Sequence, residues 1–248
     1  MVFRPSKEWR VGCCSLITVT ELSRGYASVW KRTFPFISKL VRKSNLQKET
    51  FEDHLTSGVD SSRRAIVNEI AFRVFEKAYE LDVETLEAED IKIISVRACK
   101  YIADLEKVDN VAMPNKEELK ESILIAERTK QYFIVKESRS ALTVSPRFNG
   151  CGMVSFCFGD VLSSDTLYEI KAGEREFRAV DLKQLLIYVT LNFSEHDQKI
   201  KYIALLNPRL GSYVKLGIKE SVEIASGKAP ADAFYELINF FDNPDDFR

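Results

Sequence analysis

The spacing of apolar side chains along the chain changes near residue 140. Before that point they recur every three or four positions, which is typical of amphipathic helices. Helices are predicted over 21–43, 60–81, 82–107 and 115–136. Pro35 should interrupt the first of these helices, and Asp60 or Ser61 should cap the start of the second.

Beyond residue 140, short runs rich in β-branched and aromatic residues are bounded by Gly, Pro, Asn and Ser, which is typical of strands. Strands are predicted over 140–148, 152–162, 166–173, 199–206 and 212–218. The leucine spacing within 178–193 instead predicts a helix, and a terminal helix should run from about Ala229 to Phe241. A helix between the third and fourth strands requires a crossover, so the sheet should be mixed rather than a simple meander.

These elements predict an α/β fold with a mixed central sheet flanked by helices. We expect a mostly helical region over 1–139 and a second domain, which contains the sheet, over 140–248. With 248 residues, 45% of them hydrophobic, the chain can bury a substantial core.

The composition predicts a protein of the reducing cytoplasm that does not span a membrane. Five cysteines are an odd number, and their spacing fits neither a zinc site nor a disulfide framework. No apolar stretch approaches the roughly 20 residues that a transmembrane helix needs. The run VGCCSLITV near the N-terminus is short and lacks a convincing cleavage site, so it is not expected to be a signal peptide.

The overall charge provides no general attraction to a polyanion, because 36 basic and 37 acidic residues leave a formal net charge of −1. Residues 1–50 differ, with ten Lys and Arg against three Glu. Two interpretations of this basic segment stay open. It is either a platform for nucleic acid or a partner, in which Lys39, Arg42 and Lys43 take part, or a set of solvated helix faces.

The most informative stretch of the chain is GDVLSSDTLYEIKAG, which begins at residue 159. If SSDT is the turn of an antiparallel hairpin, Leu162 lies opposite Leu167. The same register places Asp160 opposite Glu169, and the alternation of side chains places Lys171 on the face of Glu169. Opposed like charges are destabilising, so a positive group is expected beside the two carboxylates.

The helix predicted over 178–193 carries two polar side chains that can reach this hairpin. Gln184 and Tyr188 are four residues apart, so both lie on one face of the helix and can lean over the carboxylates. The alternative interpretation of the charged residues in the hairpin is a salt bridge on a solvated sheet face.

The series Asp160, Glu169-x-Lys171 and Gln184-x-x-x-Tyr188 resembles the PD-(D/E)xK phosphodiesterase superfamily of restriction-like nucleases, in the branch with a Q-x-x-x-Y helix. The resemblance covers roughly residues 140–217 and implies a restriction-endonuclease-like core. The sequence departs from the motif at Gly159, which stands where the nominal proline would be. Residues before 140 resemble no family.

The resemblance implies a metal site in the hairpin. Asp160 and Glu169 would hold Mg²⁺ or Mn²⁺, with the carbonyl of Ile170 as a third ligand, because hard cations prefer oxygen donors. Glu69 or Glu127 could supply the additional carboxylate from a helix that some members of the superfamily use.

The resemblance also assigns roles to the other motif residues. Lys171 would orient or help to deprotonate the attacking water and place positive charge beside the phosphate. Gln184 would order the site, and Tyr188 would pack or contact the backbone. Other polar residues are weaker candidates, since Asp165 is most simply a turn residue and Arg209 is either a phosphate ligand or a surface turn residue. His54 and His196 lie in polar segments, without a Ser or Cys partner that would suggest a catalytic triad.

The predicted function is therefore the metal-dependent hydrolysis of phosphodiester bonds, with DNA as the favoured substrate, in bacterial antiviral defence or DNA processing. One alternative is cleavage of RNA, such as tRNA, by the same site. Another is a non-catalytic scaffold subunit, against which the presence of all five motif residues argues. The sequence contains no ATPase motif, so an energy-driven step would need a protein partner, which could also supply targeting; a homo-oligomer stays open.

Overall fold

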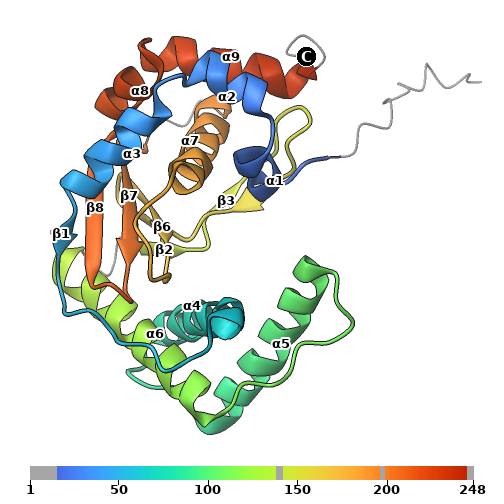
Figure 1. Ribbon diagram of the computed structural model, residues 1–248, viewed down its shortest axis with the longest axis vertical. Helices are drawn as coiled ribbons and strands as arrows, with labels where there is room; N and C mark the ends of the chain where they lie inside the picture. The colour runs from blue at the N-terminus through green and yellow to red at the C-terminus, as the bar shows by residue number, and fades with distance from the viewer. Residues whose placement is uncertain (1–15, 138–141, 196–198, 245–248) are drawn as a thin grey trace, which may run out of the picture.

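The computed structural model describes residues 16–137, 142–195 and 199–244 (Figure 1). Its helices are α1 (Val19–Arg24), α2 (Ala27–Thr33), α3 (Ile37–Leu46), the 3-10 turn η1 (Ser61–Arg63), α4 (Arg64–Glu80), α5 (Ala88–Glu106), α6 (Lys116–Lys136), α7 (Ala179–Ser194), α8 (Ile218–Ser226) and α9 (Pro230–Asp242). Its strands are β1 (Glu49–Thr50), β2 (Leu142–Val144), β3 (Arg147–Phe148), β4 (Cys157–Phe158), β5 (Val161–Ser163), β6 (Thr166–Ile170), β7 (Tyr202–Asn207) and β8 (Ser212–Gly217).

Six of these strands form one mixed sheet in the spatial order β1-β8-β7-β6-β5-β2. β6 and β7 are parallel, and the other neighbouring strands are antiparallel. Helix α7 connects β6 to β7, which is the crossover that two adjacent parallel strands require. The predicted α/β fold with a mixed sheet flanked by helices is therefore confirmed.

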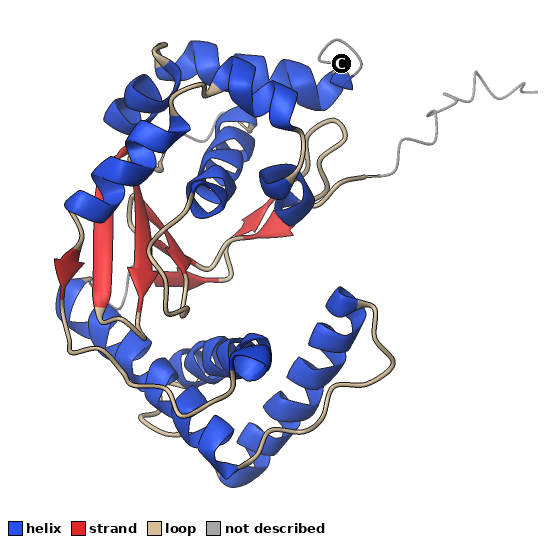
Figure 2. Ribbon diagram, viewed as in Figure 1, coloured by secondary structure: helices blue, strands red, loops and turns tan. Residues whose placement is uncertain are grey.

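Helices cover both faces of the sheet (Figures 1 and 2). On one face, α1–α3 and α7–α9 share an apolar core with strand residues such as Leu167 and Val214. On the other face, α4–α6 pack against strand residues such as Tyr168 and Ala204. The alternation of side chains along β6 separates the two cores, because Leu167 and Tyr168 are consecutive and point to opposite faces.

The N-terminal helices belong to the first of these cores. α3 packs against α7 and α8, and β1 pairs with β8, with Glu49 opposite Tyr213. Contacts therefore cross residue 140, and the division into 1–139 and 140–248 stays a prediction. None of the helices in the described ranges is long and apolar enough to cross a membrane.

The helix predictions for the N-terminal half are largely confirmed. The predicted interruption at Pro35 falls between α2, which ends at Thr33, and α3, which begins at Ile37. The side chain of Asp60 accepts a hydrogen bond of 2.8 Å from the Ser62 N–H and caps the turn that leads into α4. Helix α8 is not among the predicted elements, and its first residue, Ile218, falls at the end of the strand predicted over 212–218.

The first two predicted strands are wrong in extent, because both bend at the same point. Ser145 separates β2 from β3 with a left-handed φ of 53°, and Gly159 and Asp160 separate β4 from β5. At Gly159 a Cβ atom would lie 3.1 Å from a ring carbon of Phe148, so only glycine fits there without displacing its neighbours. Beyond the bend, β3 and β4 form a separate two-stranded ribbon.

Candidate active site

The hairpin of β5 and β6 holds Asp160 against the end of β6. β5 and β6 pair in the predicted register, with Leu162 opposite Leu167. Asp160 lies directly before β5, and its Oδ2 accepts a hydrogen bond of 2.6 Å from the N–H of Ile170. Since Ile170 follows Glu169 on β6, both carboxylates belong to the same end of the hairpin.

Lys171 is the positive group expected beside the carboxylates. Its Nζ lies 2.6 Å from Glu169 Oε1 and 2.9 Å from Gln184 Oε1, so it connects the hairpin to α7. Glu169 is only 3% exposed. The alternative of a salt bridge on a solvated sheet face is therefore wrong.

Burial and neighbouring charge perturb both Asp160 and Lys171. Burial, followed by the negative charge of Glu169, raises the pKa of Asp160 to about 8, although Lys171 and the N–H of Ile170 oppose this. Burial acts to lower the pKa of Lys171, but the charges of Glu169 and Asp160 outweigh it and raise that pKa. Lys171 is thus an ammonium at neutral pH. A cation bound between the carboxylates would relieve their mutual repulsion.

Tyr188 packs beneath the hairpin instead of lining a cleft. Its side chain is buried, and its ring stacks on Phe148, with centroids 5.4 Å apart and planes at 20°. Burial and, next, the charges of Glu169 and Asp160 raise the pKa of its hydroxyl, so Tyr188 stays neutral at physiological pH. Of the two actions expected of this residue, packing is the one observed.

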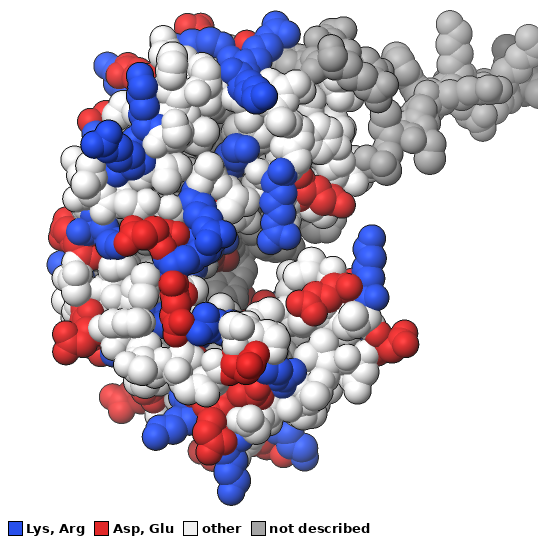
Figure 3. Space-filling model, viewed as in Figure 1, with Lys and Arg blue, Asp and Glu red and all other residues white. Residues whose placement is uncertain are grey.

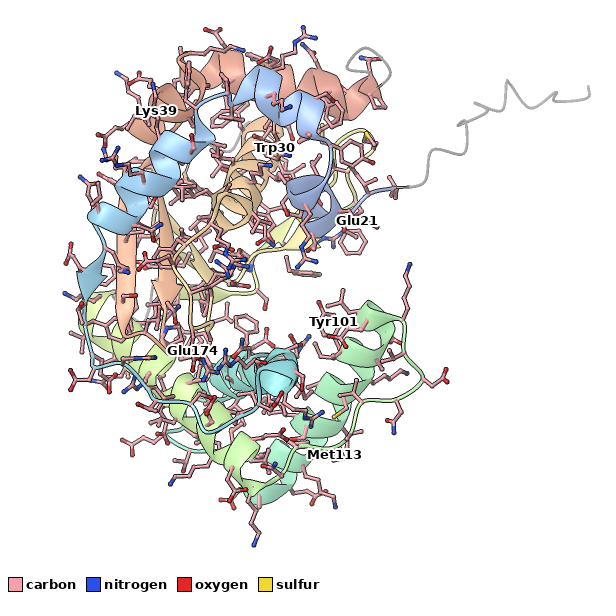
Figure 4. The ribbon with its side chains drawn as sticks, viewed as in Figure 1. Glu21, Trp30, Lys39, Tyr101, Met113 and Glu174 are labelled. Carbon is pink, nitrogen blue, oxygen red and sulfur yellow. The ribbon has the colours of Figure 1, made fainter. Side chains whose placement is uncertain are left out.

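A cleft of about 620 Å³ opens beside the charged residues. Asp160, Glu169 and Lys171 line it from the sheet, while α4, α5 and α6 form the opposite wall. The space-filling view shows the molecule hollowed between these two parts (Figure 3). Tyr101 of α5 lies at this opening (Figure 4).

Helix α4 contributes one of the two additional carboxylates considered from the sequence. Glu69 lines the cleft, and its Oε1 accepts a hydrogen bond of 2.7 Å from Arg73. Its charge also helps to raise the pKa of Asp160, after the effects of burial and Glu169. Glu127 is exposed and borders a different cavity, so it is not part of this site.

The oxygen donors at the hairpin fit a small divalent cation. Glu169 Oε2 is buried and has no hydrogen-bond partner within the part of the chain that the structure describes. In that same part, no group of three or more His, Cys, Asp or Glu side chains is arranged to hold a metal ion. Mg²⁺ at phosphoryl-transfer sites is commonly held by one or two carboxylates, with water and substrate completing its shell. Asp160 and Glu169 with the carbonyl of Ile170 would meet this requirement.

Arg209 is neither a phosphate ligand nor a surface turn residue. It is fully buried, its Nε donates a hydrogen bond of 2.6 Å to the carbonyl of Ala172, and its Nη1 pairs with Glu121. Nη2 donates to Asn68 Oδ1 at 3.1 Å. Arg209 therefore braces the backbone directly after Lys171. Sequence reasoning missed this role because a polar N-P-R turn after a strand carries no local signal of burial.

The remaining candidates lie away from the cleft. The carbonyl of Asp165 accepts hydrogen bonds of 2.8 and 3.0 Å from the N–H groups of Lys201 and Tyr202, as expected of a turn residue. His54 is exposed, and His196 lies outside the described residues. In the described part of the basic segment, Lys43 of α3 pairs with Glu220, and Lys48, which follows α3, pairs with Glu176; both interpretations of the segment stay predictions. The described cysteines, Cys99, Cys151 and Cys157, are free thiols.

No protein-family model matches the chain, and no curated protein matches it in sequence. Inference about function therefore rests on the geometry of the residues that line the cleft.

Proposed function

We propose that the protein is a metal-dependent nuclease that hydrolyses phosphodiester bonds in DNA. The proposal rests on the surroundings of Glu169, whose carboxylate is buried beside the cleft. One of its oxygens pairs with Lys171, and the other has no partner in the described part of the chain. A buried, unpartnered carboxylate oxygen costs free energy, which a bound cation would recover.

The order of the elements supports the resemblance to the PD-(D/E)xK superfamily. If β2, β5 and β6 are the first three core strands, Asp160 stands at the start of the second and Glu169 lies on the third. Lys171 follows directly, and Gln184 comes from α7, the next helix along the chain. The strand β7, parallel to β6, follows α7, which is the order that a restriction-endonuclease-like core would have.

Each polar residue has a chemical role in this proposal. When bound, Mg²⁺ or Mn²⁺ supplies a Lewis acid for the phosphoryl oxygen and lowers the pKa of a water molecule. Asp160 and Glu169 hold the cation from the sheet side of the cleft. Lys171 places its ammonium beside the phosphate and orients the attacking water, and Gln184 keeps that ammonium in position by accepting its hydrogen bond.

The cellular setting is part of the same proposal. A cytoplasmic protein active in antiviral defence or DNA processing would draw targeting or ATP-driven movement along DNA from a protein partner. The cleft itself needs neither for hydrolysis, so the isolated protein should cut DNA when the cation is present.

The direct test is to incubate the purified protein with plasmid, linear DNA and tRNA in Mg²⁺, Mn²⁺ or EDTA. We expect DNA cleavage with either cation and none in EDTA. Asp160→Asn should lower the rate by at least about a thousandfold, since metal chemistry contributes several kcal/mol. Asp165→Asn is the matched control, because it changes an acid of the same hairpin outside the cleft.

Two results would contradict this proposal. Cleavage of tRNA without cleavage of DNA would assign the site to RNA. A folded protein that leaves these three substrates and single-stranded DNA intact with either cation would favour a scaffold subunit.

A further inference from the structure

The ribbon of β3 and β4 beside the cleft has one buried face and one exposed face. Arg147 lies opposite Phe158, and Phe148 lies opposite Cys157. Phe148 is buried against Tyr188, so the alternation of side chains turns Arg147 and Phe158 to the other face. Phe156, two residues before Phe158, shares that face.

The exposed face carries aromatic rings where a solvated ribbon normally carries polar side chains. Phe156 and Phe158 are 57% and 54% exposed, and their ring centroids lie 6.2 Å apart. The guanidinium of Arg147 lies 5.2 Å from the centroid of the Phe156 ring. Arg147 forms no ion pair with any residue that the structure describes, so its charge is available to a ligand. We call Arg147, Phe156 and Phe158 the aromatic platform.

The aromatic platform is continuous with the candidate active site. Phe158 lines the same cleft as Asp160 and precedes it by two residues. On the opposite wall, Tyr101 is 46% exposed, with the guanidinium of Arg73 5.6 Å from its ring centroid. Each wall of the cleft therefore presents an aromatic ring, Phe158 on the sheet side and Tyr101 with its neighbour Arg73 on the other.

We propose that the aromatic platform binds the unpaired bases of a single-stranded DNA segment and leads its backbone to Asp160 and Glu169. Unpaired bases stack on exposed aromatic rings whatever their sequence, whereas the faces of paired bases are covered within a duplex. Arg147 contacts a phosphate of the bound strand. This inference rests on the proposed function, which makes DNA the substrate. It adds that single-stranded DNA is the form that reaches Asp160 and Glu169.

The test is to measure binding of a short oligo(dT) and of a duplex of equal length in EDTA, where no cleavage occurs. We expect the single strand to bind more tightly than the duplex. The double substitution Phe156→Leu and Phe158→Leu should weaken single-strand binding by at least about fivefold and leave duplex binding unchanged. Arg147→Gln should lower the slope of log affinity against log salt by about 0.7, as expected for one lost phosphate contact.

Phe36→Leu is the matched control. Phe36 is 42% exposed and has Lys39 Nζ 4.3 Å from its ring centroid, but it lies between α2 and α3, outside the cleft. Single-strand affinity should not change in this variant. An equal loss in Phe36→Leu and in the double variant would contradict the platform.

A measurement on the wild-type protein makes the test independent of whether the variants fold. A single strand that contains 2-aminopurine should lose fluorescence on binding, because stacking quenches this base. Equal affinity for single strand and duplex without quenching would overturn the inference. Single-strand binding by the platform in a protein that never cleaves DNA would contradict only the proposed function. Metal-dependent cleavage with unchanged binding in the double variant would contradict only the platform.

Discussion

Two buried ion pairs lie at the ends of the neighbouring parallel strands β6 and β7, and they differ in how completely they are satisfied. After β7, Arg209 donates to Ala172 and Asn68 and pairs with Glu121, both of whose carboxylate oxygens also accept from Ser57. At the end of β6, Lys171 occupies only one oxygen of Glu169, and the other has no partner in the described ranges.

This difference distinguishes a pair that stabilises the fold from one that can bind a ligand. A buried ion pair contributes to stability only when further hydrogen bonds satisfy its remaining lone pairs and protons, as they do around Arg209. The pair at Glu169 leaves a buried acceptor without a partner among the described residues, which costs free energy unless a ligand supplies one. The two pairs also cooperate, because the bond from Arg209 to Ala172 holds the backbone that positions Lys171.

The largest difference between the two ion pairs, in cleavage and in stability, should appear when Glu169 and Glu121 are each replaced by glutamine. Glu169→Gln should lower cleavage by at least about a thousandfold, because the cation loses a ligand. Without metal its stability should be equal to or slightly above that of the wild type, because Asp160 remains as a counter-charge for Lys171 while the repulsion between two neighbouring carboxylates is removed. Glu121→Gln should instead cost about 3–5 kcal/mol, since Arg209 loses its charged partner. Cleavage assays and urea unfolding measure both effects. A large loss of metal-free stability in Glu169→Gln would show that its pair with Lys171 is structural.

A smaller effect on cleavage is expected when Lys171, the ammonium that pairs with Glu169, is replaced. Lys171→Met should lower turnover by about a hundredfold or more, while DNA affinity in EDTA changes little, because one phosphate contact among several contributes modestly to binding. Gln184→Leu should lower turnover less, since in the proposed mechanism Gln184 acts only through Lys171, from which it accepts a hydrogen bond. Single-turnover rates and binding isotherms separate the two quantities. Equal fractional losses of affinity and rate would assign Lys171 to binding alone.

The smallest effect, on stability alone, should come from the ion pair of Arg63 and Glu118. Both carboxylate oxygens of Glu118 have a partner, as those of Glu121 do beside Arg209. Arg63 contacts both carboxylate oxygens of Glu118, at 2.7 and 3.1 Å. The hydrogen bond from Arg63 lowers the pKa of Glu118 below its ordinary value of 4.5, although burial opposes this. Because the folded pKa lies below the unfolded one, the stabilisation is present above about pH 4.5 and is lost as the pH falls through the folded pKa.

Urea unfolding at a series of pH values tests this dependence. The free-energy difference between the wild type and Glu118→Gln should be constant near neutral pH and shrink in acid. Glu117→Gln is the control, because Glu117 is exposed on the same helical turn. If the free-energy difference for Glu118→Gln does not vary with pH, the charge of Glu118 does not contribute to the stability of the fold.

Much of the candidate site could be predicted from the sequence because it depends on local regularities. A four-residue turn between two apolar runs sets Leu162 opposite Leu167, and alternation then places Lys171 on the face of Glu169. The helical spacing of 178–193 likewise predicted a helix that brings Gln184 to the hairpin, where it contacts Lys171.

The bend of the hairpin could not be predicted in the same way. At Gly159 the chain passes close to Phe148, and Phe148 stacks on Tyr188 from a helix some forty residues later. The runs 140–148 and 152–162 therefore resembled single strands, and the ribbon of β3 and β4 carried no signal of its own.

The sequence by itself determined the longer helices, the mixed sheet and the series of side chains from Asp160 to Gln184, because periods of two and of 3.6 residues are properties of the local chain. Only the tertiary structure decided which of these side chains are buried, satisfied or exposed. Arg209 is buried because α4 and α6 supply its partners, Asn68 and Glu121, and Phe158 is exposed because the ribbon turns away from the sheet. Burial depends on elements that are distant along the chain, and no local pattern encodes it.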